Sequence, residues 1–256
     1  MEFALDGQTL IILIGFGFLA AFIDSVVGGG GLIALPALLF TGLPPASAVA
    51  TNKLASTMGS FTSTVTFWRS GQLDMRSISK IFPLTIIGAM IGAWLVSLMN
   101  PEVLKPLMLI MLLGVLVYTL LNKEWGDISR VKQLSLGKVI LFLSVIFFIS
   151  LYDGFLGPGT GSFLMFAFLF IGYDFLKAAG NAKLLNFGSN IGALVMFLML
   201  GEVVFIYGFI MGFAQIAGAI VGSRFAIKKG SGYVRILYIV VTISLLLKNG
   251  YDYFVQ

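Results

Sequence analysis

The sequence predicts an all-α polytopic membrane protein built from two inverted-topology repeats, each with five membrane segments. The 256-residue chain is 59% hydrophobic and only 11% charged, with a mean hydropathy of +1.03. A soluble domain carries about 25% charged residues. Apolar runs without charges recur along the whole chain, each long enough to enter or cross a bilayer. A glycine-rich break that follows an aspartate occurs twice.

Composition excludes several classes of function. The chain contains no cysteine and no histidine, which excludes disulfides, Cys/His metal sites, haem ligation and catalysis by a cysteine nucleophile or a histidine base. We therefore expect no cofactor and no metal. The net charge of +5 does not indicate nucleic acid, because the basic residues lie in loops between apolar runs. The first apolar run lacks a basic n-region and a cleavage site, so it is interpreted as a span.

The first repeat is predicted to cover residues 1–122. Its first apolar run reaches Asp24, breaks at Gly28–Gly31 and continues as a short apolar piece. The predicted segments are 8–27, 32–43, 46–68, 80–99 and 103–121. The second segment is short, because twelve helical residues rise about 18 Å, whereas the bilayer core is about 30 Å thick.

The second repeat, residues 136–256, follows a predicted cytoplasmic linker at 123–135. The break returns here as Asp153-Gly-Phe-Leu-Gly-Pro-Gly-Thr-Gly161, and a short segment again follows it. The predicted segments are 136–153, 162–172, 175–200, 203–223 and 234–253. Irregular backbone inside a membrane survives only where protein buries it or water lines it, so both breaks are expected to lie at a functional centre.

The charges of the loops determine the predicted orientation. The loops 69–80, 121–138 and 224–235 are basic and are predicted to be cytoplasmic. Each half then needs an odd number of crossings, so each short segment is counted as one crossing. Five segments per half give repeats of opposite orientation. The alternative has eight crossings, two re-entrant loops and parallel repeats, and it conflicts with the loop charges unless 69–80 lies outside.

The two halves match without large gaps. Ala50–Ser56 aligns with Gly180–Asn186, and Asp24 aligns with Asp153 in nearly the same register. Two glycine pairs, each separated by one helical turn, also match in the register of the first alignment. They are predicted to serve close helix packing only: Gly88, Gly92, Gly218 and Gly222.

A polar stripe marks the long helix after each short segment. Lys53, Ser56 and Ser60 fall on one helix face, and Lys183 begins the same pattern in the second half. An ammonium group with hydroxyl and amide donors suits a small anion. The candidate substrate-binding side chains are Lys53, Lys183, Asn52, Ser56, Asn181, Asn186 and Asn190. Two alternatives remain open: the lysines snorkel to the membrane surface, or the polar residues join helices.

The two breaks supply further candidates. Asp24 and Asp153 are expected to carry protons or to pair with a lysine, with a position at the water boundary as the alternative. Helix N-termini follow the breaks, and their free N–H groups favour anions. The candidate backbone donors are Gly30, Gly31, Gly159 and Gly161.

These motifs resemble the TauE/SafE family of sulfite exporters and 4-toluene sulfonate uptake permeases. The resemblance rests on the glycine run before Pro36, the Ala-Thr-Asn-Lys-Leu stretch at 50–54 and the motif at 152–161, and it covers about residues 10–250. It implies a multi-pass permease of the prokaryotic cytoplasmic membrane that transports sulfite, sulfonates or sulfoacetate-like anions.

We therefore expect a non-enzymatic permease that moves a small sulfur-containing anion by alternating access with proton coupling. The expected partners are this anion and the bilayer, with a homodimer left open and no nucleic acid. A channel-like anion pore is consistent with the same polar stripes. An intramembrane enzyme is less favoured, because the polar residues are spread evenly over both halves.

Overall fold

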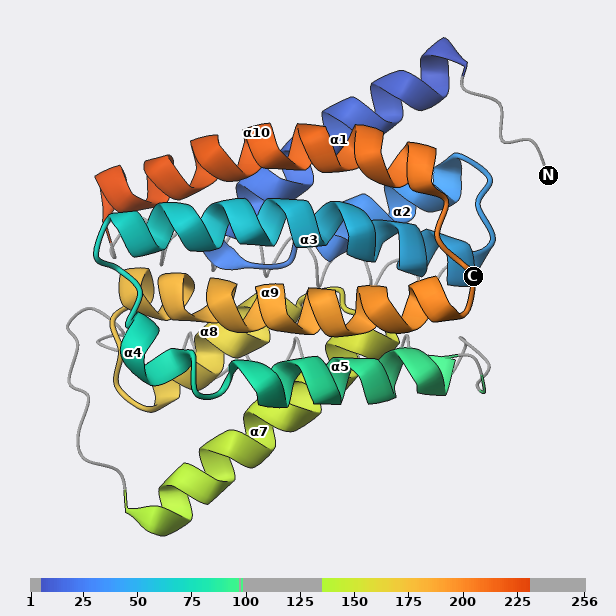
Figure 1. Cartoon of the computed structure of the whole chain (residues 1–256). Helices are drawn as coiled ribbons and strands as arrows, with labels where there is room; N and C mark the ends of the chain where they lie inside the picture. Colours follow the sequence, from blue (N-terminus) through green and yellow to red (C-terminus); the bar gives the residue numbers. More distant parts are fainter. Residues whose placement is uncertain (1–5, 97, 99–134, 231–256) are drawn as a thin grey trace, which may run out of the picture.

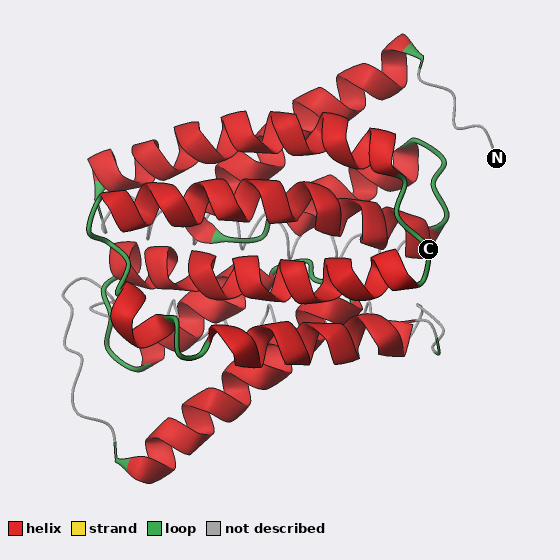
Figure 2. Cartoon of the chain, in the orientation of Figure 1, coloured by secondary structure: helices red, strands yellow, loops and turns green. Residues whose placement is uncertain are grey.

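The computed structural model describes residues 6–96, 98 and 135–230, and all regular structure in these ranges is helical (Figures 1 and 2). The helices are α1 (Gly7–Val27), α2 (Gly31–Phe40), α3 (Pro45–Arg69), α4 (Met75–Ile78), α5 (Phe82–Val96), α7 (Leu136–Phe155), α8 (Thr160–Phe170), α9 (Phe175–Met199) and α10 (Phe205–Lys229). The predicted segments 103–121 and 234–253, and the predicted linker 123–135 apart from Ser135, lie outside the described residues.

The described helices have the length and surface of membrane segments. Four of them, α1, α7, α9 and α10, are long and apolar enough to cross a bilayer. Large apolar side chains, among them Ile11, Phe40, Phe148 and Phe213, are exposed on the outside of the bundle. Polar side chains are instead buried along α3 and α9. This distribution is the one that a lipid environment selects.

Local sequence signals fix the helix ends in both halves. Asp174 caps α9 by accepting a hydrogen bond of 2.8 Å from the backbone N–H of Lys177. In the first half, Pro44 stands at the position of Asp174, and Pro45 occupies the first turn of α3, where a missing N–H costs nothing. Gly71 and Gly201, which occupy matching positions in the two halves, both adopt φ of 73° after these helices. A left-handed φ favours glycine.

The chain reverses at each glycine break. In Figure 1, α1 starts at the end of the bundle where α2 finishes, and α7 and α8 form the same kind of hairpin from the opposite end. The short helices therefore lead the chain back and do not cross to the far end, which corrects the crossing count made from the loop charges. The sides of the loops are unaffected, since a hairpin followed by one long helix also changes sides once.

Helices of one half pack on those of the other. The helix α10 packs on α1 and α3, α5 packs on α7 and α9, and α3 lies beside α9 at the centre. A side chain at Gly92 would overlap the carbonyl group of Leu151 in α7, and one at Gly218 would overlap that of Phe18 in α1. These glycines therefore serve close packing, as predicted.

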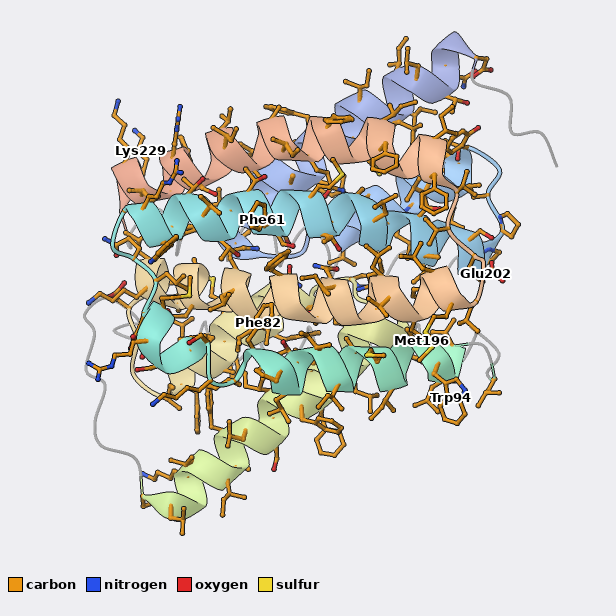
Figure 3. The ribbon with its side chains drawn as sticks, in the orientation of Figure 1. Phe61, Phe82, Trp94, Met196, Glu202 and Lys229 are labelled. Carbon is orange, nitrogen blue, oxygen red and sulfur yellow. The ribbon has the colours of Figure 1, made fainter. Side chains whose placement is uncertain are left out.

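Matching helices run in opposite directions. In Figure 1, α3 runs from right to left, whereas α9, its counterpart, runs from left to right. The two ends of the bundle carry different charges: Lys229 lies at one end and Glu202 at the other (Figure 3). The basic residues Arg69 and Arg224 line one common pocket, so the predicted loops 69–80 and 224–235 begin at the same end.

Candidate functional site

The two glycine breaks meet inside the bundle. Gly28 has a φ of 81°, and a Cβ atom there would overlap the backbone of Gly161 and Ser162. The hydroxyl of Ser162 donates a hydrogen bond of 2.9 Å to the carbonyl of Val27. On the other side of the contact, Gly31 faces the backbone of Pro158. Glycine is therefore required where the tips of the two hairpins touch.

Two ion pairs cross between the halves at this contact. The Lys53 ammonium in α3 lies 2.8 Å from the Asp153 carboxylate at the end of α7. The Lys183 ammonium in α9 lies 2.7 Å from the Asp24 carboxylate at the end of α1. Each half therefore supplies one lysine and one aspartate, and each lysine pairs with the aspartate of the other half. The four groups together carry no net charge.

The two pairs differ in their environment. The side chains of Lys53 and Asp153 are 2% and 3% exposed, and Ser189 donates a second hydrogen bond to Asp153. The Lys183 side chain is 2% exposed, but that of Asp24 is 21% exposed. Asp24 also accepts a hydrogen bond of 3.2 Å from the backbone N–H of Gly30. Asp24 is therefore the carboxylate of the four groups that water or a solute reaches most easily.

This geometry excludes one interpretation of the lysines. Both side chains are buried at the centre of the bundle, so they do not snorkel to the membrane surface. The aspartates also pair with lysines and not with each other. A peptide-cleaving aspartate dyad needs two carboxylates that share a proton, and the pairing with lysines does not provide it.

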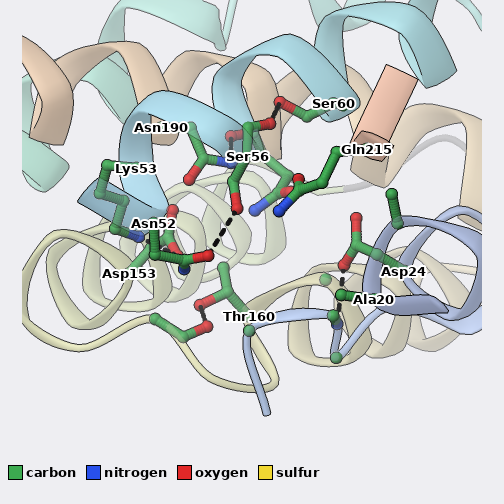
Figure 4. A pocket seen from close by; sticks show the side chains of 18 of the residues that line it. Ala20, Asp24, Asn52, Lys53, Ser56, Ser60, Asp153, Thr160, Asn190 and Gln215 are labelled. Carbon is green, nitrogen blue, oxygen red and sulfur yellow. Dashed lines mark hydrogen bonds and ion pairs between the residues drawn. The ribbon is translucent and has the colours of Figure 1, made fainter. Parts of the chain in front are cut away.

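A small polar cavity lies against the ion pairs. Its volume is about 30 Å³, enough for about two water molecules. Figure 4 shows Asp24 on one side of this cavity and the Lys53–Asp153 pair on the other. Both halves contribute to the lining, which comprises Ala20, Ala21, Asp24, Ser25, Gly29, Gly30, Gly31, Asn52, Lys53, Ser56, Gly59, Ser60, Asp153, Gly157, Gly159, Thr160, Gly161, Asn186, Asn190 and Gln215.

Most of the candidate site residues lie in this lining, and two do not. Lys183 is not part of the lining, although its partner Asp24 is. Asn181 lies elsewhere, where its side-chain oxygen accepts a hydrogen bond of 2.9 Å from the backbone N–H of Asp74. Its counterpart Thr51 accepts one of 3.0 Å from the backbone N–H of Val204. Each residue thus binds the N-cap position of a helix in the other half, Asp74 before α4 and Val204 before α10.

The polar residues of the stripe mainly bond to their own helices. The Ser60 hydroxyl donates to the Ser56 carbonyl at 2.6 Å, and the Asn190 amide donates to the Asn186 carbonyl at 2.9 Å. The Ser56 hydroxyl donates to the side chain of Asn52 at 3.3 Å. A ligand in the cavity would need these hydroxyl and amide groups to rotate toward it.

Sequence reasoning missed several residues of the site, among them Gln215 and Ser189. Gln215 of α10 lines the cavity, and Ser189 contacts Asp153. Gln215 is a polar residue in an otherwise apolar stretch at 203–223, and this isolation was an available signal. Ser189 lies next to Asn190 on the helix but one step away from the stripe, so periodicity gave no signal for it.

A helical membrane protein whose broken helices meet at a polar centre has the architecture of the secondary transporters. The chain is a member of the TauE/SafE family, since the family model described as "Sulfite exporter TauE/SafE" matches residues 13–249. It is thus a multi-pass membrane transporter of this family. No solved structure matches the chain.

Curated relatives agree with this assignment. "Probable membrane transporter protein ORF9" of Sinorhizobium sp is 37% identical over 240 residues, covering 93% of this chain and 91% of the relative. "Probable membrane transporter protein" of Haemophilus influenzae is 36% identical over 254 residues and 98% of both chains. "Probable membrane transporter protein YfcA" of Escherichia coli is 36% identical over 252 residues, covering 98% of this chain and 93% of the relative.

Proposed function

We propose that the protein moves a small sulfur-containing anion, such as sulfite or a short sulfonate, across the cytoplasmic membrane of a prokaryote by alternating access coupled to protons. The observation that carries the proposal is the pair of crossed Lys–Asp contacts beside a small polar cavity. The description of the matching family as a sulfite exporter supports the sulfur oxyanion.

The architecture we infer is an inverted repeat of five membrane segments in each half. The opposite directions of α3 and α9 support it (Figure 1), as do the crossed packing of α5 and α10 and the gathering of basic residues at one end. In such a repeat the substrate site lies near the middle of the membrane, where the halves meet. The cavity lies at that junction.

Asp24 is the proton-coupling residue in this mechanism. Its carboxylate accepts hydrogen bonds from the Lys183 ammonium and the Gly30 N–H, two donors of the kind that a sulfur oxyanion would need. Protonation of Asp24 weakens its hold on both donors and leaves the site with a net positive charge. An anion then binds with the charges balanced, so anion and proton travel together.

Binding requires the halves to separate at the hairpin tips. A cavity of about 30 Å³ is far smaller than the 300–1,000 Å³ typical of ligand sites. The backbones of Gly28 and Gly161 touch at the tips, so this contact opens without moving a side chain. As they separate, Asn52, Ser56, Asn186 and Asn190 turn toward the anion, and Gly31, Gly159 and Gly161 supply backbone donors.

Uptake into proteoliposomes tests the proposal. Sulfite, sulfoacetate and other short sulfonates should show saturable uptake and counterflow, whereas a channel-like pore would show neither. Lys183→Met should lower uptake by at least tenfold, because a donor to the anion is lost. Lys138→Met, a matched change at an exposed lysine, should leave uptake unchanged. Normal uptake by the Lys183→Met variant would remove the proposed site.

A further inference from the structure

A second and larger pocket lies between α3 and α10, away from the ion pairs. Its volume is about 570 Å³, and it sits along the C-terminal turns of both helices. Its lining residues are Phe61, Thr62, Val65, Thr66, Arg69, Ser70, Ile220, Arg224, Ile227 and Lys228. They recur at helical spacing on the facing sides of two packed helices. We call this pocket the α3–α10 slot.

The walls of the slot are mainly apolar. Phe61 is 52% exposed, and Ile220 and Ile227 are partly exposed on the α10 side. The hydroxyls of Thr62 and Thr66 donate to carbonyl groups of their own helix, each at 2.8 Å. The hydroxyl hydrogens of both threonines are therefore already bonded, and the two side chains offer the slot mostly their methyl groups. Such walls suit a hydrocarbon chain better than a polar solute.

Three cations stand at one end of the slot. Arg69, Arg224 and Lys228 are all exposed. None of the described residues that line the slot is acidic, and the ion pairs of the described ranges do not include these three. An apolar slot with three unpaired cations at one end complements a molecule with an anionic head and an alkyl chain.

The other half of the molecule provides an internal comparison. In the register that aligns Lys53 with Lys183, Arg69 corresponds to Met199, Arg224 to Trp94 and Lys228 to Leu98. The matching helices α5 and α9 also pack on each other, so this kind of packing does not require cations. The positive charge is therefore a property of the basic end of the bundle alone, which is the end predicted to face the cytoplasm.

We propose that the α3–α10 slot binds one anionic phospholipid. Its phosphate contacts Arg69, Arg224 and Lys228, and an acyl chain lies against Phe61, Ile220 and Ile227. Basic pockets between membrane helices on the cytoplasmic side suit such headgroups. The bound lipid bridges α3 of the first half and α10 of the second, and thereby favours the packing of these two helices.

Lipid titration of the purified full-length protein in detergent tests this site, with native mass spectrometry and thermal unfolding as readouts. Phosphatidylglycerol should bind and raise the unfolding temperature, whereas phosphatidylcholine should do so much less. The triple variant Arg69→Gln, Arg224→Gln, Lys228→Gln should bind phosphatidylglycerol about a hundredfold more weakly, a loss of about 3 kcal/mol.

The control removes equal charge from the same end of the molecule outside the slot, with Arg76→Gln, Lys80→Gln and Lys138→Gln. This variant should bind phosphatidylglycerol like the wild type. The charge-conserving pair Arg69→Lys, Arg224→Lys should keep most of the binding and shows that the slot still folds. Equal losses in both triple variants would overturn the proposal, as would equal binding of the two lipids. Protection by inorganic phosphate as strong as that by the lipid would also overturn it.

Discussion

The buried Lys53–Asp153 pair gives the sharpest prediction about stability. Lys53→Met keeps most of the length of the side chain but leaves the Asp153 carboxylate, which is 3% exposed, without its cation. An uncompensated buried charge costs about 3–5 kcal/mol. One kcal/mol shifts the unfolding temperature by about 2–4 °C in chains of this size. The variant should therefore unfold about 6–20 °C lower than the wild type.

A double-mutant cycle isolates this interaction. Asp153→Asn alone strands the ammonium of Lys53 and should destabilise by a similar amount. The double variant Lys53→Met, Asp153→Asn strands neither charge and should recover most of the loss, since a buried pair is often close to neutral against uncharged residues. The coupling energy should then be at least about 2 kcal/mol. Thermal unfolding in detergent measures all four proteins.

Additive losses in this cycle would contradict the pairing. If the losses of the two single variants simply add in the double variant, the two side chains do not interact and the pairing is wrong. The second pair serves for comparison. Lys183→Met should cost less than Lys53→Met, because its partner Asp24 is 21% exposed and water stabilises the stranded carboxylate.

Three further variants test the packing and the outlying residue of the stripe. Gly92→Ala should lower stability by about 1–3 kcal/mol, because its methyl group meets the Leu151 carbonyl, whereas Gly15→Ala, which faces open space, should not; equal unfolding temperatures would contradict this. Gly28→Ala should abolish transport, since it forces a left-handed φ of 81° on alanine and meets Gly161; uptake at the wild-type rate would refute the contact between the hairpin tips. Asn181→Ala should lower stability by about 1 kcal/mol, because its bond to Asp74 is lost, and should leave the KM for the anion unchanged. Asn190→Ala should raise the KM. A raised KM in Asn181→Ala would show that Asn181 belongs to the binding site.

The sequence predicted the helices well because membrane segments carry strong local signals. The segment expected at 46–68 is α3 at Pro45–Arg69, and the one expected at 175–200 is α9 at Phe175–Met199. The expected segment 203–223 falls short of the end of α10 at Lys229. Charged residues such as Arg224 and Lys228 ended the apolar run there, although they continue the helix beyond the apolar zone.

The path of the short helices was beyond the reach of local signals. The loop charges show only whether the chain crosses the membrane an odd or an even number of times between two loops. A hairpin followed by one crossing helix and a run of three crossing helices both give an odd number. The reversal at Gly28 depends on a left-handed φ of 81°. A side chain at Gly28 would also meet Gly161, which belongs to the other half of the chain, and no local pattern indicates that contact.

The candidate site was predictable in its residue types but not in its pairings. The repetition of Lys53 and Asp24 at 183 and 153 indicated a symmetric centre. Which aspartate each lysine meets depends on how the two halves pack, and this is a long-range property. Asn181 was predicted to bind the substrate because it extends the polar stripe. Its side chain instead accepts a hydrogen bond from the backbone N–H of Asp74, a contact that also depends on how the halves pack.

Transport driven by a pH gradient in Asp24→Asn proteoliposomes tests the coupling mechanism most directly. We expect this variant still to exchange labelled sulfite for unlabelled sulfite, since Lys183 and the Gly30 N–H are both released for the anion. When a pH gradient is imposed, the wild type should accumulate sulfite and the variant should not. Gradient-driven accumulation by Asp24→Asn at the wild-type level would contradict the claim that this carboxylate carries the proton.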